Sequence, residues 1–318
     1  MNKVTIVMYH YVRDLANSRF PQIRGLDYSL FKKQIEFFKQ NFQVVTMEEV
    51  IAAWNENYEL PEHALLLTFD DGYIDHYTYV LPVLTEYKMQ GSFFIPGKPF
   101  TESTLLDVNK IHFILASQPG AVLMQELLER LNYYRGTEYD FPSNEELIQQ
   151  YAVANRFDTK ETIFVKRILQ TALPAPLRNR ISSDLFAKYV GGLSEEKFSR
   201  ELYMNYDQIK CMKRNGMYIG IHGYDHYWLG NLKKEDMQQD IQRALEVLDG
   251  IVETDRWVMN YPYGSYSKEV TEYLENTGCR LGLTTEVRIA DPSMDSRFTL
   301  PRLDTNDFPP KSENYKNI

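Results

Sequence analysis

The sequence predicts an α/β protein with a largely parallel sheet or barrel and a mostly helical insertion. Short apolar runs alternate with segments of helical periodicity over the first hundred residues and again beyond about residue 205. Between about 101 and 205 the alternation stops and only helical patterns remain. We therefore expect one barrel domain over residues 1–318, interrupted by an insertion at about 101–205.

Four apolar runs before the insertion predict strands. These runs cover 4–9, 42–45, 63–69 and 91–96. Between them, the apolar residues of 29–41 recur at helical spacing, and Thr46 with Glu49 forms a capping box that opens a second helix. A third helical pattern, 75–87, is interrupted near Pro82, which cannot donate a backbone hydrogen bond.

The same alternation returns after the insertion. The predicted strands cover 217–223, 256–264, 279–286 and 297–304, and the helices between them cover 232–250 and 267–278. Inside the insertion the helical patterns cover 120–131, 144–155 and 161–173. Alternating strands and helices favour parallel pairing, which brings the carboxyl ends of the strands to one rim.

Composition argues against several functions. The chain has a net charge of −9 and no basic run, which disfavours nucleic acids and anionic membranes as partners. Its two cysteines, Cys211 and Cys279, match neither a disulfide framework nor a Cys-x-x-Cys metal site. No stretch approaches the ~18 apolar residues of a transmembrane segment, and the N-terminus resembles a strand more than a signal peptide. We expect a cytoplasmic protein, of an oligomeric state that the sequence does not indicate.

Two adjacent carboxylates end an apolar run in the stretch LLLTFDDGY. Asp70 and Asp71 point in different directions if they end a strand, so that one can hold a metal while the other takes a proton from water. The plain alternative is an Asp-Gly turn that caps the next helix, and for an isolated D-D-G it is the favoured interpretation.

Two histidines follow another predicted strand in the stretch YIGIHGYDHYWL. His222 and His226 are four residues apart and can reach one ion. A pair of histidines alone is a moderate signal for a metal site. The chain has only six histidines, however, and two of them fall together at the end of a predicted strand. Two imidazoles and one carboxylate, with positions left open for water and substrate, are typical of a hydrolytic Zn²⁺ centre.

Position strengthens both motifs. His10, the Asp70–Asp71 pair, His222 and the turn at 261–264 each lie at or just beyond the end of a predicted strand. In a parallel β/α barrel these residues would lie together on the catalytic rim. Arg302 lies within or just beyond the last predicted strand.

The ordered combination T-F-D-D-G, H-x-x-x-H and a Pro-Tyr turn resembles the polysaccharide deacetylase superfamily, the NodB-homology domain of carbohydrate esterase family four. The resemblance covers about 1–100 and 205–305. It implies a distorted (β/α)7-type barrel and metal-dependent hydrolysis of an N-acetyl group on an amino sugar. The helical insertion has no counterpart in the minimal domain of the family.

The resemblance also implies roles for individual residues. Asp70 would be the catalytic base, and Asp71, His222 and His226 would hold a divalent metal, Zn²⁺ first and Co²⁺ or Ni²⁺ as alternatives. The backbone N–H of Tyr263 would donate to the oxyanion, and the leaving amine would still need a general acid.

Three departures from the family pattern qualify this expectation. Gly223 replaces the Ser or Thr that follows the first metal histidine, so that this ligand lacks its usual support. Asn260 replaces the Arg that orients the catalytic Asp, and Arg302 is our candidate substitute, with a surface Arg as the even alternative. The late Leu-x-His that supplies the general acid is L-T-T at 283–285.

His10 is the candidate for the missing acid. The first strand of a closed barrel neighbours the last, so a histidine at its end can reach the same corner of the site. The stretch MYHYV also resembles the N-terminal Tyr-His motif of the branch that contains poly-N-acetylglucosamine deacetylases. Considered alone, His10 would more often be structural.

The remaining expectations concern the substrate groove. Four residues near the motifs are candidates for contact with the sugar: Tyr73, Tyr224, Pro262 and Tyr263. Tyr227 and Trp228 are further candidates. His76, on the helix after T-F-D-D-G, is expected to be exposed.

The leading hypothesis is a carbohydrate N-deacetylase that acts on a nucleotide-, lipid- or polymer-linked N-acetylated sugar in the synthesis of surface polysaccharide or glycoconjugates. The apparent lack of a leader favours a nucleotide- or lipid-linked substrate. The alternatives are a deformylase or O-deacetylase with the same site, and a degenerate domain that binds glycan without turnover. Loss of the family's Arg and late His motivates the last alternative.

Overall fold

Two compact units make up the protein. The computed structural model describes residues 2–155 and 158–318. One unit comprises Met1–Asp14, Gly25–Thr104 and Ser199–Ile318, and the other comprises Leu15–Arg24 and Leu105–Phe198. The predicted insertion therefore contains nearly the whole second unit, although residues 156–157 lie outside the described part. No pattern in the sequence indicates that Leu15–Arg24 joins that unit. The assignment of the chain to a single domain stays a prediction.

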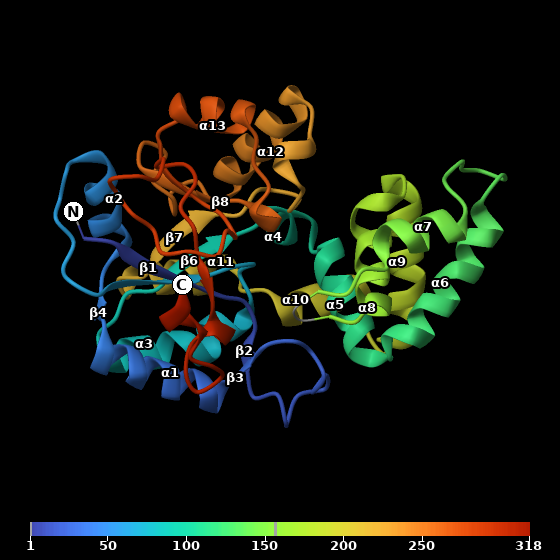
Figure 1. Ribbon diagram of the computed structural model, residues 1–318, viewed down its shortest axis with the longest axis horizontal. Coiled ribbons are helices and arrows are strands. Elements are labelled where there is room, and N and C mark those ends of the chain that lie inside the picture. The colour runs from blue at the N-terminus through green and yellow to red at the C-terminus, as the bar shows by residue number, and fades with distance from the viewer. Residues whose placement is uncertain (1, 156–157) are drawn as a thin grey trace. The chain divides into compact units, whose positions relative to one another are not determined.

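An eight-stranded sheet forms the centre of the first unit. Its hydrogen-bonded order is β10-β1-β5-β6-β7-β8-β9, with β4 paired to β5 off this path, and the pairings between its strands are parallel. Figure 1 shows α1 and α3 on one side of the strands and α12 and α13 on the other. The predicted α/β class is confirmed.

The strands agree with the predicted runs except at the C-terminus. They are β1 (Val4–Tyr9), β4 (Gln43–Val44), β5 (Ala64–Phe69), β6 (Ser92–Ile95), β7 (Tyr218–Ile221), β8 (Trp257–Asn260), β9 (Cys279–Leu283) and β10 (Leu303–Asp304). A separate parallel pair joins β2 (Val12–Arg13) to β3 (Leu26–Asp27). The strand predicted at 297–304 is wrong over most of its length. Pro301 has no N–H to donate, and only Leu303–Asp304 pairs regularly with β1.

Helices surround the sheet and build the second unit. Those of the first unit are α1 (Tyr28–Asn41), α2 (Met47–Asn55), α3 (Leu81–Tyr87), α4 (Lys98–Glu102), α11 (Tyr206–Arg214), α12 (Lys234–Val247) and α13 (Lys268–Glu275). Those of the second are α5 (Asp107–Ser117), α6 (Gly120–Tyr134), α7 (Asn144–Tyr151), α8 (Lys160–Arg167) and α9 (Ala175–Tyr189), while α10 (Glu195–Leu202) lies at the boundary. The capping box of Thr46 and Glu49 is confirmed. The helical pattern at 75–87 forms a π-helical turn, His76–Val80, that leads into α3 with Pro82 in its first turn.

Strand periodicity decides which side chains face the site. Along β5, Leu65, Leu67 and Phe69 join the large apolar cluster that contains residues of α1, α3, α11, α12 and α13. Leu66 belongs instead to a second cluster, together with Val258 of β8. Alternate residues of a strand share a face, so Asp70 and Asn260 continue the face of Leu66 and Val258. Sheet geometry therefore directs both polar side chains to the same side.

No helix within the described residues combines the length and the apolar character that a membrane crossing requires.

Candidate active site

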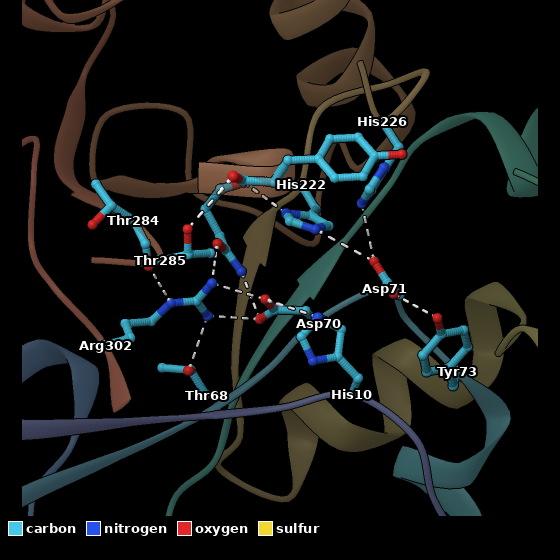
Figure 2. Close-up of polar contacts among 12 residues, drawn as sticks. His10, Thr68, Asp70, Asp71, Tyr73, His222, His226, Thr284, Thr285 and Arg302 are labelled. Atoms are coloured by element: carbon cyan, nitrogen blue, oxygen red, sulfur yellow. Dashed lines mark hydrogen bonds and ion pairs between the residues drawn. The ribbon is translucent and has the colours of Figure 1, made fainter. Parts of the chain in front are cut away.

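Strand ends assemble the predicted site residues. Asp70 and Asp71 follow β5, His222 follows β7, and Asn260 ends β8. Figure 2 shows Asp70, Asp71 and His222 close together, with His10, which follows β1, beside Asp70. The rim that the sequence predicts therefore exists in the structure.

The three predicted metal ligands lie within reach of one ion. One ligand atom from each of Asp71, His222 and His226 lies within 4.8 Å of the others, and all three residues are buried. Asp71 Oδ1 is 3.3 Å from the Nε2 atoms of both histidines but makes no hydrogen bond with either or with another described residue. The Tyr73 hydroxyl donates to the other oxygen, Asp71 Oδ2, at 2.5 Å. A buried carboxylate oxygen without a hydrogen bond, facing two imidazoles, fits a divalent cation.

Hydrogen bonding fixes the tautomer of His222. Its Nδ1 lies 2.7 Å from the Asn260 carbonyl oxygen, which can only accept, so Nδ1 carries the proton. The lone pair of neutral His222 is therefore on Nε2, facing Asp71 Oδ1. Two lone pairs at this distance repel unless a proton or a cation lies between them. A bond from the second ring nitrogen to a backbone carbonyl is typical of metal-ligating histidines.

The electrostatics of Asp71 keep it ionised. Burial alone would raise its pKa, but the electrostatic interactions of the carboxylate with the neighbouring imidazoles, His222 and His226 first, outweigh burial, and the pKa lies well below its usual range. Burial lowers the pKa of His226, which favours the neutral, ligating form of this imidazole.

Asp70 is held by two side chains from distant parts of the chain. Arg302 donates from Nη1 to Oδ1 at 2.8 Å and from Nη2 to Oδ2 at 2.9 Å. Asn260 donates from Nδ2 to Asp70 Oδ1 at 2.6 Å and accepts from Arg302 Nη2 at 2.9 Å. Arg302 also donates to Thr68 Oγ1 and to the Thr284 carbonyl. The alternative of a surface Arg302 is therefore wrong, since this residue is 1% exposed.

The ion pair with Arg302 sets the charge of Asp70. Burial would raise the pKa of Asp70, but Arg302 and, to a smaller extent, His10 more than offset burial, so the pKa lies below its ordinary value. His10 Nε2 lies 3.8 Å from Asp70 Oδ2, and the His10 side chain is 39% exposed. Arg302 thus holds both oxygens of the Asp70 carboxylate and Asn260 holds Oδ1, while the accessible imidazole of His10 lies near Oδ2.

A buried carboxylate replaces the support that Gly223 lacks. Asp240 of α12 accepts hydrogen bonds from the backbone N–H groups of Tyr224 and Asp225, at 2.8 and 2.9 Å, in the loop that carries His226. Gly223 has a φ of +69°, and a Cβ there would lie 2.8 Å from Asp240 Oδ2. The glycine therefore makes room for Asp240, which fixes the loop between the two histidines.

Three residues of the site adopt left-handed backbone conformations. Asp71, His226 and Tyr263 have φ values of 76°, 58° and 58°. For a residue other than glycine, this conformation costs roughly 1 kcal/mol or more of free energy. Residues that adopt it are frequent at functional sites. The turn at Tyr263 places its ring parallel to that of Trp228, with centroids 4.5 Å apart, and edge-on to His226.

Some expected substrate contacts do not fit the structure. The ring of Tyr73 is fully buried between Tyr11 and Tyr203, where its hydroxyl serves Asp71. Tyr224 is 2% exposed and hydrogen-bonds to Thr101 and Glu102. Pro262 is buried as well. These predictions are wrong because aromatic residues beside a catalytic motif also pack its back; Tyr263 and Trp228 remain partly exposed.

Sequence reasoning missed three residues of the site. The sequence pattern at Asn260 indicates only the loss of an Arg, whereas the Asn260 side chain donates to Asp70. Asp240 gave no signal, because an acidic residue on an amphipathic helix is usually solvated. His76 was expected to be exposed, but it is fully buried and its Nε2 lies 2.9 Å from the His10 carbonyl oxygen.

Comparison with known proteins agrees with this geometry. The family model of polysaccharide deacetylases matches residues 57–131 and 186–282, more than half of the chain. The Bacillus subtilis (strain 168) protein YxkH, whose name places it among polysaccharide deacetylases, is 21% identical over 89% of this chain and 65% of its own length. The Escherichia coli (strain K12) poly-beta-1,6-N-acetyl-D-glucosamine N-deacetylase is 34% identical over 27% of this chain and 13% of its own length. The chain thus spans less than two thirds of these relatives.

A solved structure supports the fold. IcaB from Ammonifex degensii has a TM-score of 0.59, with 18% identity over 100% of this chain and 98% of that chain. The predicted distorted (β/α)7-type barrel is therefore confirmed, with a curled parallel sheet as its core. The family match, together with the T-F-D-D-G and H-x-x-x-H residues on one rim, shows that the chain belongs to the polysaccharide deacetylase family.

Proposed function

We propose that the protein is a metal-dependent hydrolase that removes N-acetyl groups from amino sugars of a polysaccharide. The observation that carries this proposal is the convergence of Asp71, His222 and His226 beside ionised Asp70. Among the described residues, the buried Asp71 Oδ1 has no hydrogen-bond partner, which suits a carboxylate oxygen that binds a cation. Intact contacts to Asp70 from Arg302 and Asn260 argue against the degenerate, non-catalytic alternative.

Asp71, His222 and His226 would hold the divalent cation, with Zn²⁺ the best match to two imidazoles and one carboxylate. When bound, such an ion lowers the pKa of water and polarises the acetyl carbonyl. Co²⁺ and Ni²⁺ accept the same ligands, so binding of each ion to this site can be measured in competition with Zn²⁺.

Asp70 would take the proton from the water that attacks the acetyl carbon. Its low pKa keeps it ready to accept at neutral pH, and Arg302 with Asn260 aims its free lone pairs. The backbone N–H of Tyr263 would stabilise the oxyanion. When the carbon–nitrogen bond breaks, His10 would donate a proton to the leaving amine, which gives acetate and a free amino sugar.

A polymer is the substrate that we propose, because a relative that is 34% identical over 27% of this chain is named for a polymer of N-acetylglucosamine. The stacked rings of Trp228 and Tyr263 offer an aromatic surface next to His226, as sugar-binding sites often do. Nucleotide- or lipid-linked sugars are the competing carriers of the same N-acetyl group.

Acetate release tests this proposal. The zinc-loaded protein is incubated with β-1,6-linked N-acetylglucosamine oligomers, with the matching β-1,4 oligomers and with nucleotide-linked N-acetylglucosamine. We expect release from an oligomer and its loss in Asp70→Asn. Release from the nucleotide sugar alone would replace the polymer by a precursor, and release from none of the three would contradict the proposed activity.

A further inference from the structure

The backbone carbonyl of His10 is hydrogen-bonded to a side chain, whereas the carbonyls of the residues before and after it are hydrogen-bonded to backbone N–H groups. The Tyr9 carbonyl accepts from the Asp70 N–H and the Tyr11 carbonyl accepts from the Leu26 N–H, each at 2.9 Å. Between them, the His10 carbonyl lies 2.9 Å from His76 Nε2. The two backbone bonds persist whatever side chains the sequence supplies, but the bond at His10 depends on residue 76.

Chemistry fixes the direction of this hydrogen bond. A carbonyl oxygen can only accept, so His76 Nε2 carries the proton and donates it to His10. His76 Nδ1 is then unprotonated and has no hydrogen-bond partner among the described residues. Burial lowers the pKa of His76 to about 4, although the hydrogen bond to the His10 carbonyl and the charges of Asp71 and Asp70 oppose this shift. The His76 imidazole therefore stays neutral during the proposed proton transfer by His10.

Packing alone does not explain a histidine at position 76. The ring is fully buried and packs against Phe69, Tyr73 and Phe93 in tilted or edge-on geometry, with ring centroids 5.5–5.7 Å apart. An apolar ring would fill this space without leaving a buried nitrogen unpaired, which costs roughly 1–3 kcal/mol. What the imidazole adds is the directed N–H toward the His10 carbonyl.

The local backbone is also built to present this side chain. His76 begins the π-helical turn His76–Val80, a rare element that is frequent at functional sites. One residue earlier, Asp75 binds Arg13 through two hydrogen bonds of 2.8 and 3.0 Å. The turn after T-F-D-D-G is therefore hydrogen-bonded to the segment after β1 at two residues, His10 and Arg13.

We propose that His76 is a positioning residue for His10: its Nε2–H holds the residue-10 carbonyl and so directs the His10 imidazole toward Asp70. The proposal rests on the proposed function, in which His10 is the general acid. It explains how a half-exposed side chain beyond the end of β1 keeps a defined position, 3.8 Å from Asp70 Oδ2. No network beyond this one bond is required.

A double-mutant cycle separates positioning from a general structural role. His76→Phe keeps a ring but removes the donor, whereas His76→Gln retains a donor at the Nε2 position. We expect His76→Phe to lower kcat roughly 10- to 100-fold with unchanged KM and metal content, and His76→Gln to restore most of the loss. In the His10→Asn background, His76→Phe should have no further effect. The exposed His63, as His63→Gln, is the matched control.

Two results would overturn the proposal: equal losses from His76→Phe in both backgrounds, or a His76→Gln variant as impaired as His76→Phe. If His76→Phe does not fold, His76→Leu takes its place in the cycle. A measurement independent of turnover uses ¹³C-labelled histidine, with the His10 signal assigned by its loss in His10→Asn. We expect that signal to shift in His76→Phe and to return in His76→Gln. An unshifted signal contradicts the proposal even if the protein proves not to be a deacetylase, whereas absent acetate release contradicts only the proposed function.

Discussion

Arg302 and Asp70, separated by 232 residues, form a doubly hydrogen-bonded ion pair in the buried part of the site. Both Asp70 oxygens are engaged, and Asn260 adds a bond to one of them. A guanidinium matches a carboxylate in this two-pronged way, whereas an ammonium does not. Arg302, which lies just before β10, thus orients Asp70 with a positive charge that Asn260 lacks.

Replacement of Arg302 should weaken the base rather than the metal site. In Arg302→Lys we expect kcat to fall about 100-fold while zinc content is unchanged, because Asp70 loses its paired geometry. Arg302 lowers the pKa of Asp70, so the pKa should rise in the variant and the acidic limb of the kcat/KM profile should move to higher pH. Exposed Arg256, as Arg256→Lys, is the control. An unmoved acidic limb would separate Asp70 from the base role.

Adjacent aspartates should have separable functions. Asp71→Ala is expected to lose stoichiometric zinc, because one of three ligands is removed. Asp70→Asn should keep the metal and lose turnover. Elemental analysis of the two purified variants beside the wild type checks the pair, and equal zinc in all three would refute the ligand assignment.

His10→Asn should lower kcat roughly 10²–10⁴-fold if His10 protonates the leaving amine. Rates measured from pH 5 to 10 provide the comparison. A kcat close to that of the wild type would move the acid role to another group.

The Gly223–Asp240 contact predicts an asymmetry between two glycines. Gly223 and Gly216 both have positive φ, but only at Gly223 would a Cβ meet a neighbour, Asp240 Oδ2 at 2.8 Å. Gly223→Ala should therefore cost about 1–2 kcal/mol more than the backbone strain common to both, and should weaken zinc binding by displacing the His226 loop. Thermal unfolding and zinc titration of the two alanine variants test this; identical behaviour would show that Asp240 yields easily.

Buried His76 should make the protein acid-sensitive. Its pKa of about 4 in the folded state lies below the 6.5 of an unfolded chain, so below pH 6.5 the unfolded state binds the proton first. The stability that His76 confers is fully present above pH 6.5 and is lost as the pH falls toward 4, by up to about 3 kcal/mol. Urea unfolding at pH 4.5, 5.5 and 7 should show a steeper decline in the wild type than in His76→Gln. Parallel declines would contradict this.

The sequence predicted the fold and the four central residues because both depend on short-range patterns. Apolar runs and capping residues identify strands and helices locally, and parallel pairing then brings Asp70, Asp71, His222 and His226 to one rim. Segment Leu15–Arg24 and the irregular end of the barrel were not predictable in this way, since both depend on tertiary contacts.

Side-chain environment was the harder part. Nothing local distinguishes His76 or Tyr73 from an exposed residue, because their burial follows from the packing of the segment after β1 against the turn after β5. Asp240 is one of several acidic residues on α12, and only the fold shows that it faces the His226 loop. The sequence indicates Arg302 as a candidate substitute for the lost Arg, but only the folded structure shows the hydrogen bonds of Asn260.

Metal reconstitution tests the central claim most directly. The protein is stripped with chelator and titrated with Zn²⁺, and both bound zinc and acetate release from N-acetylglucosamine oligomers are measured. We predict that activity rises with zinc and saturates at about one ion per chain, with Asp71→Ala showing neither binding nor release. Full activity in the stripped protein, or stoichiometric zinc in Asp71→Ala, would contradict a metal centre at Asp71, His222 and His226.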